Sequence, residues 1–345
     1  MNATTRETTA PPAQRAPVRW SRVLRSRGWL KLIRLLAVLF MISVLTFLSL
    51  QLLPGDPARV ILGDQANDPA ALAAMRHELG LDQGIVARYL DWIGGALTGD
   101  LGSSYVTKET VASMISSRLP ITLELVILSQ LIALVLAIPA GIVAAINKGR
   151  SADHAIGLWV FGVLSTPNFV IGVILIWIFA VTLGWLPANG YQPWSEGVGA
   201  HLGSVILASI SLAAAPFALY QRVLRADYAE TLGRDFIGVA RAKGISPLRI
   251  VFRHAFRPSI LGLLTVTGLT VGVLIGSTVV VENLFGLPGL GAGLVSAVQN
   301  RDYIVVQGMT LVIACSFVLI NTLVDFLYGV VDPRLRGVGA GNREG

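Results

Sequence analysis

The chain has 345 residues, of which 54% are hydrophobic and 14% are charged, and its mean hydropathy is +0.68. Soluble domains carry about 25% charged residues, so charge this scarce cannot cover a water-facing surface. Composition therefore excludes an ordinary soluble enzyme, a disordered scaffold and a disulfide-stapled secreted module, and it indicates an all-α protein that crosses a membrane several times. The single cysteine, Cys315, lies in an apolar run with no disulfide partner and no neighbours that would form a metal site.

The first 30 residues form a basic tail, in which the Thr-, Pro-, Ala- and Arg-rich stretch 1–19 predicts disorder. The apolar run that follows is too long for a cleaved signal peptide and lacks a small-residue cleavage site. We therefore expect it to remain as the first membrane span.

Charge-free apolar runs predict six membrane-spanning helices, because a helix needs about 20 apolar residues to cross the hydrocarbon core. Five runs have suitable lengths, at residues 35–55, 125–147, 202–221, 258–281 and 303–324. The remaining run, 155–195, is twice as long, and a turn signal at 184–190 ends one tilted span near Leu183. The alternative is a re-entrant break at Pro167-Asn168.

The distribution of Lys and Arg predicts the orientation. Six spans place 21 of the 27 basic residues on the side of the termini and six on the other side. Five of these six lie in one long loop, where the bias carries little information. The positive-inside rule therefore predicts that both termini are cytoplasmic.

Motifs for catalysis are absent from the sequence. There is no H-E-x-x-H or G-x-S-x-G, and no glycine is followed by lysine, which excludes a phosphate-cradling P-loop. The glycine cluster 286–293 has the wrong spacing and context for a dinucleotide loop and predicts a turn. An ion-coupled secondary carrier usually needs a carboxylate near mid-membrane, whereas Glu124 and Asp325 lie at span ends. That class stays open as an alternative, although the sequence disfavours it.

The external segment 56–118 contains two amphipathic stretches, 69–79 and 85–97. A loop this long usually folds or binds something. It is interpreted either as a cap on the outer face or as a docking site for an external partner.

The cytoplasmic segment 222–257 carries eight basic and three acidic residues. Its small residues lead to Gly244, which predicts a helix stop, and Ser246-Pro247 predicts the start of a second short helix. Two short helices with small residues at the bend between them and one apolar face are suited to insert into a groove of a partner protein. The alternative is a basic helix attracted to anionic lipid.

Glycines recur every four residues in the fifth predicted span, at Gly268, Gly272 and Gly276. This spacing gives a smooth helix face on which another helix packs closely. The partner is either a helix of the same chain or, at a subunit interface or pore, a helix of another chain.

Several motifs occur in the order and spacing of a known family. They are Leu53-Pro-Gly-Asp-Pro57, Ala240-Arg-Ala-Lys-Gly244 with Arg253-His-Ala255, Val281-Glu-Asn-Leu-Phe-Gly-Leu-Pro-Gly-Leu-Gly291 running on to Asn300-Arg-Asp-Tyr303, and Val331-Asp-Pro-Arg334. Over residues 31–336 the chain resembles the permease subunits of dipeptide/oligopeptide-type ABC importers, the binding-protein-dependent inner-membrane components of type I.

The resemblance implies a type I permease fold in a prokaryotic plasma membrane. It implies four partners besides the lipid bilayer: a second related permease, two cytoplasmic ATPases and an external solute-binding protein, with no nucleic acid. ATP and Mg²⁺ would be used by the ATPases, so this chain would be a transport subunit without a catalytic site, a metal site or a bound cofactor. The implied domains are the tail 1–30, a first span with the external segment (31–118), a core permease domain (119–332) and a second tail (333–345).

Two sets of site residues follow from the resemblance. Coupling to the ATPase is assigned to Gly238, Ala240, Arg241, Ala242, Lys243, Gly244, Ile245 and Ser246. Contact with the binding protein is assigned to Glu282, Asn283, Phe285, Gly286, Pro288, Gly289, Arg301 and Asp302.

The chain departs from the general coupling pattern of the family, Glu-Ala-Ala-x-x-x-Gly followed by Ile-x-Leu-Pro. Gly238 and Val239 replace the first two residues, and residues 254–257 replace the last four. No role of the missing glutamate is therefore transferred. The departure is typical of the peptide branch, so a short peptide is the expected substrate, while nickel, haem, glutathione and oligosaccharide importers share the scaffold.

Overall fold

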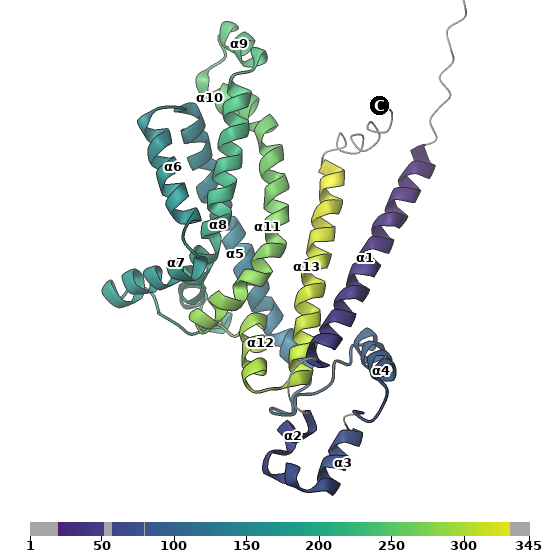
Figure 1. Cartoon of the computed structure of the whole chain (residues 1–345). Helices are drawn as coiled ribbons and strands as arrows, with labels where there is room; N and C mark the ends of the chain where they lie inside the picture. The colour runs from purple at the N-terminus through teal and green to yellow at the C-terminus, as the bar shows by residue number, and fades with distance from the viewer. Residues whose placement is uncertain (1–19, 52–56, 79, 332–345) are drawn as a thin grey trace, which may run out of the picture.

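The computed structural model describes residues 20–51, 57–78 and 80–331, which form helices and connecting loops (Figure 1). The motif at 53–57 falls largely outside these ranges, as do most of the motif at 331–334, the stretch 1–19 and the tail 333–345. The only β pairing in the described ranges is an isolated bridge between Ser103 and Thr110. The all-α prediction is confirmed.

Four long apolar helices make up the body of the molecule. They are α5 (Val111–Ile146), α8 (Val198–Leu232), α11 (Phe256–Leu284) and α13 (Tyr303–Val331). Helix α8 is the central element, because α5, α6, α7 and α11 all pack against it, while α13 packs on α11 (Figure 1). Each of the four contains a segment long and apolar enough to cross a membrane.

The run 155–195 does not form one tilted span. Helix α6 (Ser151–Leu164) ends before Pro167, and α7 (Asn168–Leu175) continues into a π-helical segment, η2 (Ile176–Thr182), at 102° to α6. Proline lacks an N–H and disfavours helix in the residue before it, which explains why the chain turns here. The expectation of one continuous tilted helix is therefore wrong, because the chain breaks at Pro167-Asn168; the bend by itself fits either a broken span or a re-entrant loop.

Helix α1 (Trp20–Gln51) lies beside α13 and carries an apolar segment, Leu32–Leu48. The external segment folds into α2 (Pro57–Leu62), a 3₁₀ turn η1 (Gly63–Asn67), α3 (Pro69–Glu78) and α4 (Ile85–Thr98). The two amphipathic stretches are thus helical over residues 69–78 and 85–97. Tyr89 on α4 hydrogen-bonds Ser43 of α1 at 2.7 Å and packs edge-on against Phe47 at a ring-centroid distance of 5.5 Å.

Buried polar contacts join the long helices in their middle. The Tyr220 hydroxyl on α8 donates to Oε1 of Gln130 on α5 at 2.6 Å and also lies against the hydroxyl of Thr270 on α11. The Gln130 amide in turn donates to Thr270 Oγ1 at 3.2 Å. Since unpaired polar groups in hydrocarbon are costly, these bonds fix how the three helices face one another.

Candidate functional site

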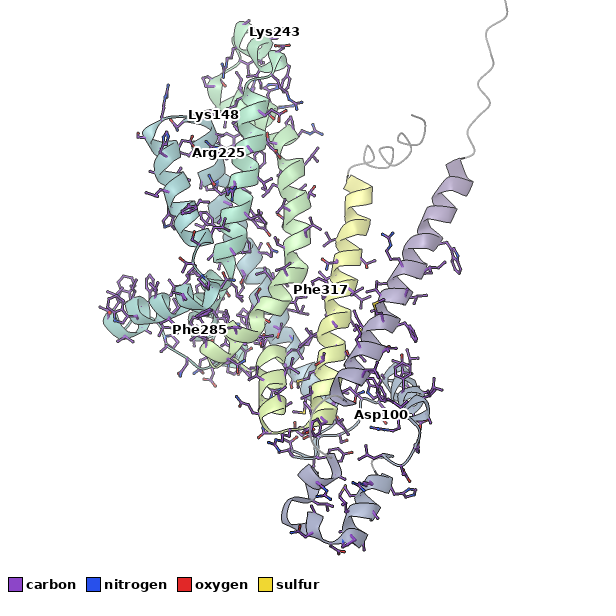
Figure 2. The ribbon with its side chains drawn as sticks, viewed as in Figure 1. Asp100, Lys148, Arg225, Lys243, Phe285 and Phe317 are labelled. Carbon is purple, nitrogen blue, oxygen red and sulfur yellow. The ribbon has the colours of Figure 1, made fainter. Side chains whose placement is uncertain are left out.

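The tip formed by residues 235–255, hereafter the coupling tip, projects beyond the long helices at the end where Lys148 also lies (Figure 2). It consists of α9 (Asp235–Ala242), the short α10 (Pro247–Arg249) and a π-helical turn η4 (Ile250–Ala255). Ile237 and Ala240 of α9 are buried against Ile250 and Ala255 of η4. One face of α9 and one face of η4 therefore anchor the tip to the core.

A hydrogen bond from α8 strengthens this anchor. The hydroxyl of Tyr228, which is fully buried, donates to the carbonyl of Val251 at 2.7 Å. The bond joins the middle of η4 to the last turns of α8. The tip is therefore held to α8 by a buried side-chain hydrogen bond as well as by the continuous backbone.

The outward face of the coupling tip is apolar although it is exposed. Phe236 and Val239 on α9 are 43% and 53% exposed, and Leu248 and Phe252 beyond the bend are 71% and 63% exposed. Exposed arginines and a lysine surround them, namely Arg241, Lys243, Arg249 and Arg253. An apolar patch rimmed by charge is typical of a protein interaction site.

Gly244 ends α9 in the way that its position predicts. Its φ is +73°, its N–H donates to the Arg241 carbonyl at 2.9 Å, and the N–H of Ile245 donates to the Ala240 carbonyl at 3.2 Å. This pair of bonds is the Schellman motif, which favours glycine because other residues are strained at positive φ. The predicted stop and the predicted second helix after Ser246 are both confirmed.

At the opposite end, Glu282 near the end of α11 is completely buried. Its Oε1 accepts a hydrogen bond from Thr122 Oγ1 of α5 at 2.7 Å, and its Oε2 accepts one from the N–H of Ala292 at 3.0 Å. Ala292 lies in the first turn of α12 (Leu290–Gln299), whose first N–H groups have no partner within the helix. The Glu282 side chain therefore caps α12 from the preceding helix.

The glycines of this turn make room for the Glu282 cap. A Cβ on Gly289 would lie 2.3 Å from the Glu282 carboxyl carbon, and one on Gly291 would lie 2.5 Å from Cα of Val279. The Thr122 hydroxyl also accepts a hydrogen bond from the N–H of Leu290 at 2.9 Å. The glycine spacing that superficially resembles a dinucleotide loop is thus explained by the close approach of α12 to α11 and α5.

The eight residues assigned to contact with the binding protein divide into two groups of four. Exposed ones are Asn283, Gly286, Pro288 and Arg301, and buried ones are Glu282, Phe285, Gly289 and Asp302. Arg301 has φ +53°, an uncommon conformation for a residue with a side chain. The exposed group can reach a partner directly, whereas the buried group holds the turn in shape.

Asp302 joins two loops that are distant in the sequence. Its Oδ2 accepts a hydrogen bond from Ser104 Oγ at 2.5 Å, and Ser104 Oγ accepts one from the N–H of Thr107 at 2.8 Å. The bond attaches the last loop of the external segment to the start of α13. The external segment and the turn before α13 therefore form one connected surface.

His201, at the start of α8, is buried with both ring nitrogens bonded. Nε2 lies 2.5 Å from Oε1 of Glu124 on α5, and Nδ1 lies 2.7 Å from the Gln192 carbonyl. Trp194 stacks on the ring at a centroid distance of 3.8 Å. Glu124 is thus part of a contact that closes the outer end of the α5–α8 pair.

The three glycines of α11 do not share one environment. Gly268 and Gly272 are buried, and a Cβ on Gly272 would lie 2.6 Å from Nδ2 of Asn321 on α13. Gly276 is exposed, and no atom of the described residues lies within 4 Å of a Cβ built there. Close packing of α11 on α13 therefore accounts for Gly272, while Gly276 faces away from the body of the chain.

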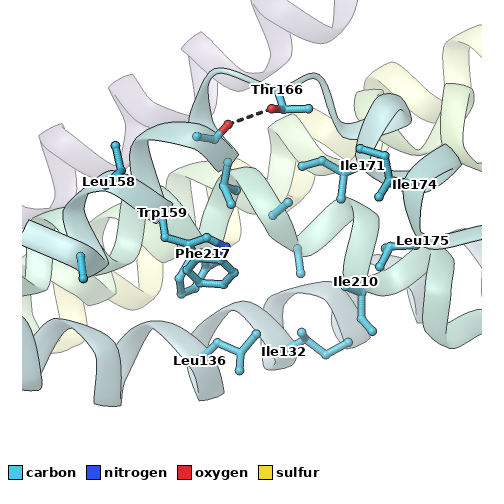
Figure 3. A pocket seen from close by; sticks show the side chains of 15 residues that line it. Ile132, Leu136, Leu158, Trp159, Thr166, Ile171, Ile174, Leu175, Ile210 and Phe217 are labelled. Carbon is cyan, nitrogen blue, oxygen red and sulfur yellow. Dashed lines mark hydrogen bonds between the residues drawn. The ribbon is translucent and has the colours of Figure 1, made fainter. Parts of the chain in front are cut away.

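An apolar cavity of about 720 Å³ lies where α6 bends into α7 (Figure 3). Its walls include Ile132 of α5, Trp159 of α6, Ile171 of α7 and Phe217 of α8. Thr166, just beyond the end of α6, is the one hydroxyl among the lining side chains, and it donates back to the Gly162 carbonyl of that helix at 2.8 Å. The lining thus suits hydrocarbon and not a polar substrate.

Sequence reasoning missed Thr122, Ser104 and His201. The first two are single hydroxyls without periodic context, and each acts through a partner that lies far away in the sequence. Around His201, Glu124 was visible only as the start of a predicted span, and Trp194 lay in a predicted loop. Pairing such residues needs the three-dimensional arrangement of the helices.

Two family models match the chain. The model described as "Binding-protein-dependent transport system inner membrane component" matches residues 137–337. A second, described as "Binding-prot-dependent transport system membrane comp, N-term", matches residues 29–126. Together they cover the long helices, the coupling tip and the external segment.

Curated relatives are similar over most of the chain. A glutathione transport system permease protein GsiC from Escherichia coli O6:H1 is 40% identical over 306 residues, which are 89% of this chain and 97% of that protein. The GsiC protein of Shigella boydii serotype 4 is 39% identical over the same lengths. A solved structure of the MetNI methionine ABC transporter in inward-facing form matches with a TM-score of 0.48 and 20% identity, covering 64% of this chain and 96% of that one.

Proposed function

The chain belongs to the family of binding-protein-dependent transport system inner membrane components, and from this premise we propose that it imports short peptides of about the size of glutathione as one permease of an ATP-driven complex. It is a permease subunit of an ABC importer and not an enzyme. The observation that supports the substrate class is the 39–40% identity, over 89% of the chain, to permeases named for glutathione transport. Glutathione is itself a tripeptide, so these relatives are compatible with the peptide branch that the sequence resembles.

The coupling tip is proposed to insert into a groove of a cytoplasmic ATPase. Its exposed apolar residues, Phe236, Val239, Leu248 and Phe252, would be covered there, and the surrounding basic side chains would meet an acidic rim. Two such ATPases, one for each permease, would hydrolyse MgATP, and this chain would bind neither ATP nor Mg²⁺. The bond from Tyr228 to Val251 supports transmission from the tip to α8.

The opposite end is proposed to receive the external solute-binding protein. Asn283, Gly286, Pro288 and Arg301 are exposed on the turns around α12, and Glu282 and Asp302 hold these turns in place. A second, related permease would complete the path across the membrane. The assembly would lie in a prokaryotic plasma membrane with both termini of this chain in the cytoplasm.

The test is transport by the reconstituted complex. The chain, its second permease, both ATPases and the binding protein are placed in proteoliposomes, and uptake of radiolabelled glutathione, a dipeptide, nickel and an oligosaccharide is measured with and without ATP. We expect ATP- and binding-protein-dependent uptake of glutathione or the dipeptide. Uptake of nickel or the oligosaccharide alone would contradict the substrate class. Uptake by this chain alone, driven by an ion gradient, would instead show a secondary carrier.

A further inference from the structure

A second cavity, of about 670 Å³, lies between α6 and α8 near the end of the molecule that carries the coupling tip. It faces the side of α6 away from the apolar cavity, although Leu158 lines both. Its lining changes character along α6. The first turn contributes Asp153 and His154, and the last turns contribute Phe161 and Leu164.

Asp153, the one carboxylate among the lining residues, is already neutralised. Arg225 of α8 donates from Nε to Oδ1 at 2.5 Å and from Nη2 to Oδ2 at 2.6 Å, and the N–H of Gly149 donates to Oδ2 at 2.9 Å. The carboxylate is 5% exposed and uses both oxygens. It therefore leaves little negative charge to repel an anion from the cavity.

The cavity retains hydrogen-bond donors and positive charge that the described residues do not satisfy. Gln221 of α8 lines it and is 1% exposed, and its Nε2 has no hydrogen-bond partner among the described residues. Arg222 also lines the cavity, is exposed and makes no ion pair within the described ranges. A buried donor without a partner requires an explanation, and the excess charge beside it favours an anionic ligand.

The other half of the lining is apolar and open. Phe161 is 68% exposed, Leu158 is 74% exposed and Leu164 is 44% exposed, and all three belong to α6. In a membrane protein, these side chains lie at the depth of lipid acyl chains, while the arginines lie toward the headgroup region. A cationic head and an apolar tail in one cavity are complementary to an anionic amphiphile.

We propose that this cavity binds an anionic phospholipid. The phosphate lies against the exposed Arg222 guanidinium, and one acyl chain follows Leu158, Phe161 and Leu164 along α6. The bound lipid fills the space between α6 and α8 beside the Asp153–Arg225 pair, and so stabilises the end of α8 from which the coupling tip extends. The inference rests on the membrane placement in the proposed function, but it does not depend on the substrate.

The test measures lipid retention by the purified complex that contains the full chain. Native mass spectrometry in mild detergent compares phosphatidylglycerol with phosphatidylcholine of identical acyl chains. We expect preferential retention of phosphatidylglycerol. Arg222→Gln should weaken it about tenfold, because the variant loses the charge-assisted hydrogen bond to the phosphate. Phe161→Ala should weaken retention of long-chain phosphatidylglycerol more than of a short-chain form.

Arg257→Gln is the matched control. Arg257 is an exposed arginine in the first turn of α11, at the end of the molecule that carries the coupling tip, and it does not line the cavity. It should retain phosphatidylglycerol as the unsubstituted chain does. Both arginine variants remove one exposed charge. If both lose phosphatidylglycerol retention equally, the loss reflects general surface charge, and the site is overturned. Equal retention of both lipids would show binding through the acyl chains alone and overturn the anionic site.

Free glycerol 3-phosphate serves as the competitor without acyl chains. If glycerol 3-phosphate displaces phosphatidylglycerol when the two are present at equal concentration, the cavity is a site for a small anion and not for a lipid. Substrate uptake is recorded on the same samples. If the complex does not take up peptide but still prefers phosphatidylglycerol, the proposed substrate is refuted and the lipid site stands. Failure of the proposed function and failure of the lipid site are therefore distinguishable.

Discussion

Glu282 shows how one buried side chain can determine the shape of an exposed surface. The residue lies in a segment that resembles a binding-protein contact, yet it is fully buried and its two oxygens accept hydrogen bonds from Thr122 and from the backbone of Ala292. Its contribution to any external contact is therefore indirect. It fixes the start of α12 and with it the exposed turn at Gly286 and Pro288.

Glu282→Ala should destabilise the chain by about 2–3 kcal/mol, because it leaves two buried donors without an acceptor and creates a cavity. Glu282→Gln should cost less, since its amide oxygen can still accept one of the two bonds. The measurement is the apparent melting temperature of the purified complex, together with its affinity for the binding protein. Asn283→Ala, at an exposed neighbouring position, is the control for melting temperature. An unchanged melting temperature for Glu282→Ala would contradict the role of the cap.

The glycine positions of α11 give a second test at the scale of residues. Leucine at Gly272 has to displace Asn321, because even a Cβ would lie 2.6 Å from its side chain, and overpacking of this kind costs about 1–3 kcal/mol. Leucine at Gly276 meets no atom of the described residues within 4 Å of its Cβ. We expect Gly272→Leu to lower the melting temperature of the isolated chain and Gly276→Leu to leave it unchanged.

Assembly distinguishes the two glycines further. If Gly276→Leu reduces recovery of the second permease while the isolated chain remains stable, this position faces a subunit interface. If Gly272→Leu melts normally, the close packing of α11 on α13 is not required for the fold.

At the scale of elements, the coupling tip allows its fold and its docking to be tested separately. Gly244 is needed for the Schellman motif at φ +73°, so Gly244→Leu strains the turn by about 1–2 kcal/mol. Gly244→Asn should be milder, because asparagine tolerates this conformation. Gly238, by contrast, is an exposed helical position with no atom of the described residues near its Cβ.

Gly238→Leu should therefore leave the fold intact and obstruct the proposed groove, which would weaken docking by about 1–3 kcal/mol, or roughly 5- to 150-fold. The measurements are ATPase binding, ATP hydrolysis stimulated by the loaded binding protein, and uptake. Wild-type values for both Gly238→Leu and Gly244→Leu, in an intact complex, would rule out the tip as the coupling element. The interpretation of this segment as a basic surface helix on anionic lipid would then be favoured.

Local signals predicted the elements of this tip accurately, since glycine at a helix stop and Ser-Pro at a helix start act within a few residues. Hydropathy was informative about the membrane and less so about helix limits. Helix α5 begins at Val111, well before the predicted span at 125, and continues across the predicted domain boundary after residue 118. Its 36 residues extend about 54 Å at 1.5 Å each, against about 30 Å of hydrocarbon. The apolar run therefore marks only the part of the helix inside the bilayer.

Contacts between distant segments could not be predicted in the same way. The pairs Glu282–Thr122, Asp302–Ser104 and Arg225–Asp153 each join residues more than 70 positions apart. One chain without periodic context gives no means of choosing among the many possible hydroxyl and carboxylate partners. The bend at Pro167 was visible as an alternative, because proline acts locally, but its 102° angle depends on how α6 and α7 pack against α8.

For the whole molecule, charge and geometry together predict the orientation in the membrane. Lys148, Arg225 and Lys243 lie at one end and Asp100 lies near the other (Figure 2), and 21 of 27 basic residues belong to the side predicted to be cytoplasmic. The number of spans depends on the bent pair α6–α7, since a re-entrant loop would return residues 183–197 to the side of Lys148. Helix α8 argues against that return. It starts at Val198 and ends near Arg225 and the coupling tip, so its first residue lies at the far end.

Single cysteines in a Cys315→Ala background test this topology. Asp82→Cys, Asp100→Cys and Ser195→Cys should react with an impermeant maleimide in intact spheroplasts, whereas Lys148→Cys and Lys243→Cys should react only in inverted vesicles. The exposed charged positions should tolerate cysteine, because surface substitutions usually change stability by about 0.5 kcal/mol or less. Labelling of Ser195→Cys from the same side as Lys148→Cys would make α6–α7 a re-entrant loop. Both ends of α8 would then lie on one side of the membrane, which contradicts its assignment as a span. Labelling of Asp82→Cys together with Lys243→Cys would reverse the placement of the external segment, and the coupling tip would then face the wrong compartment for an ATPase.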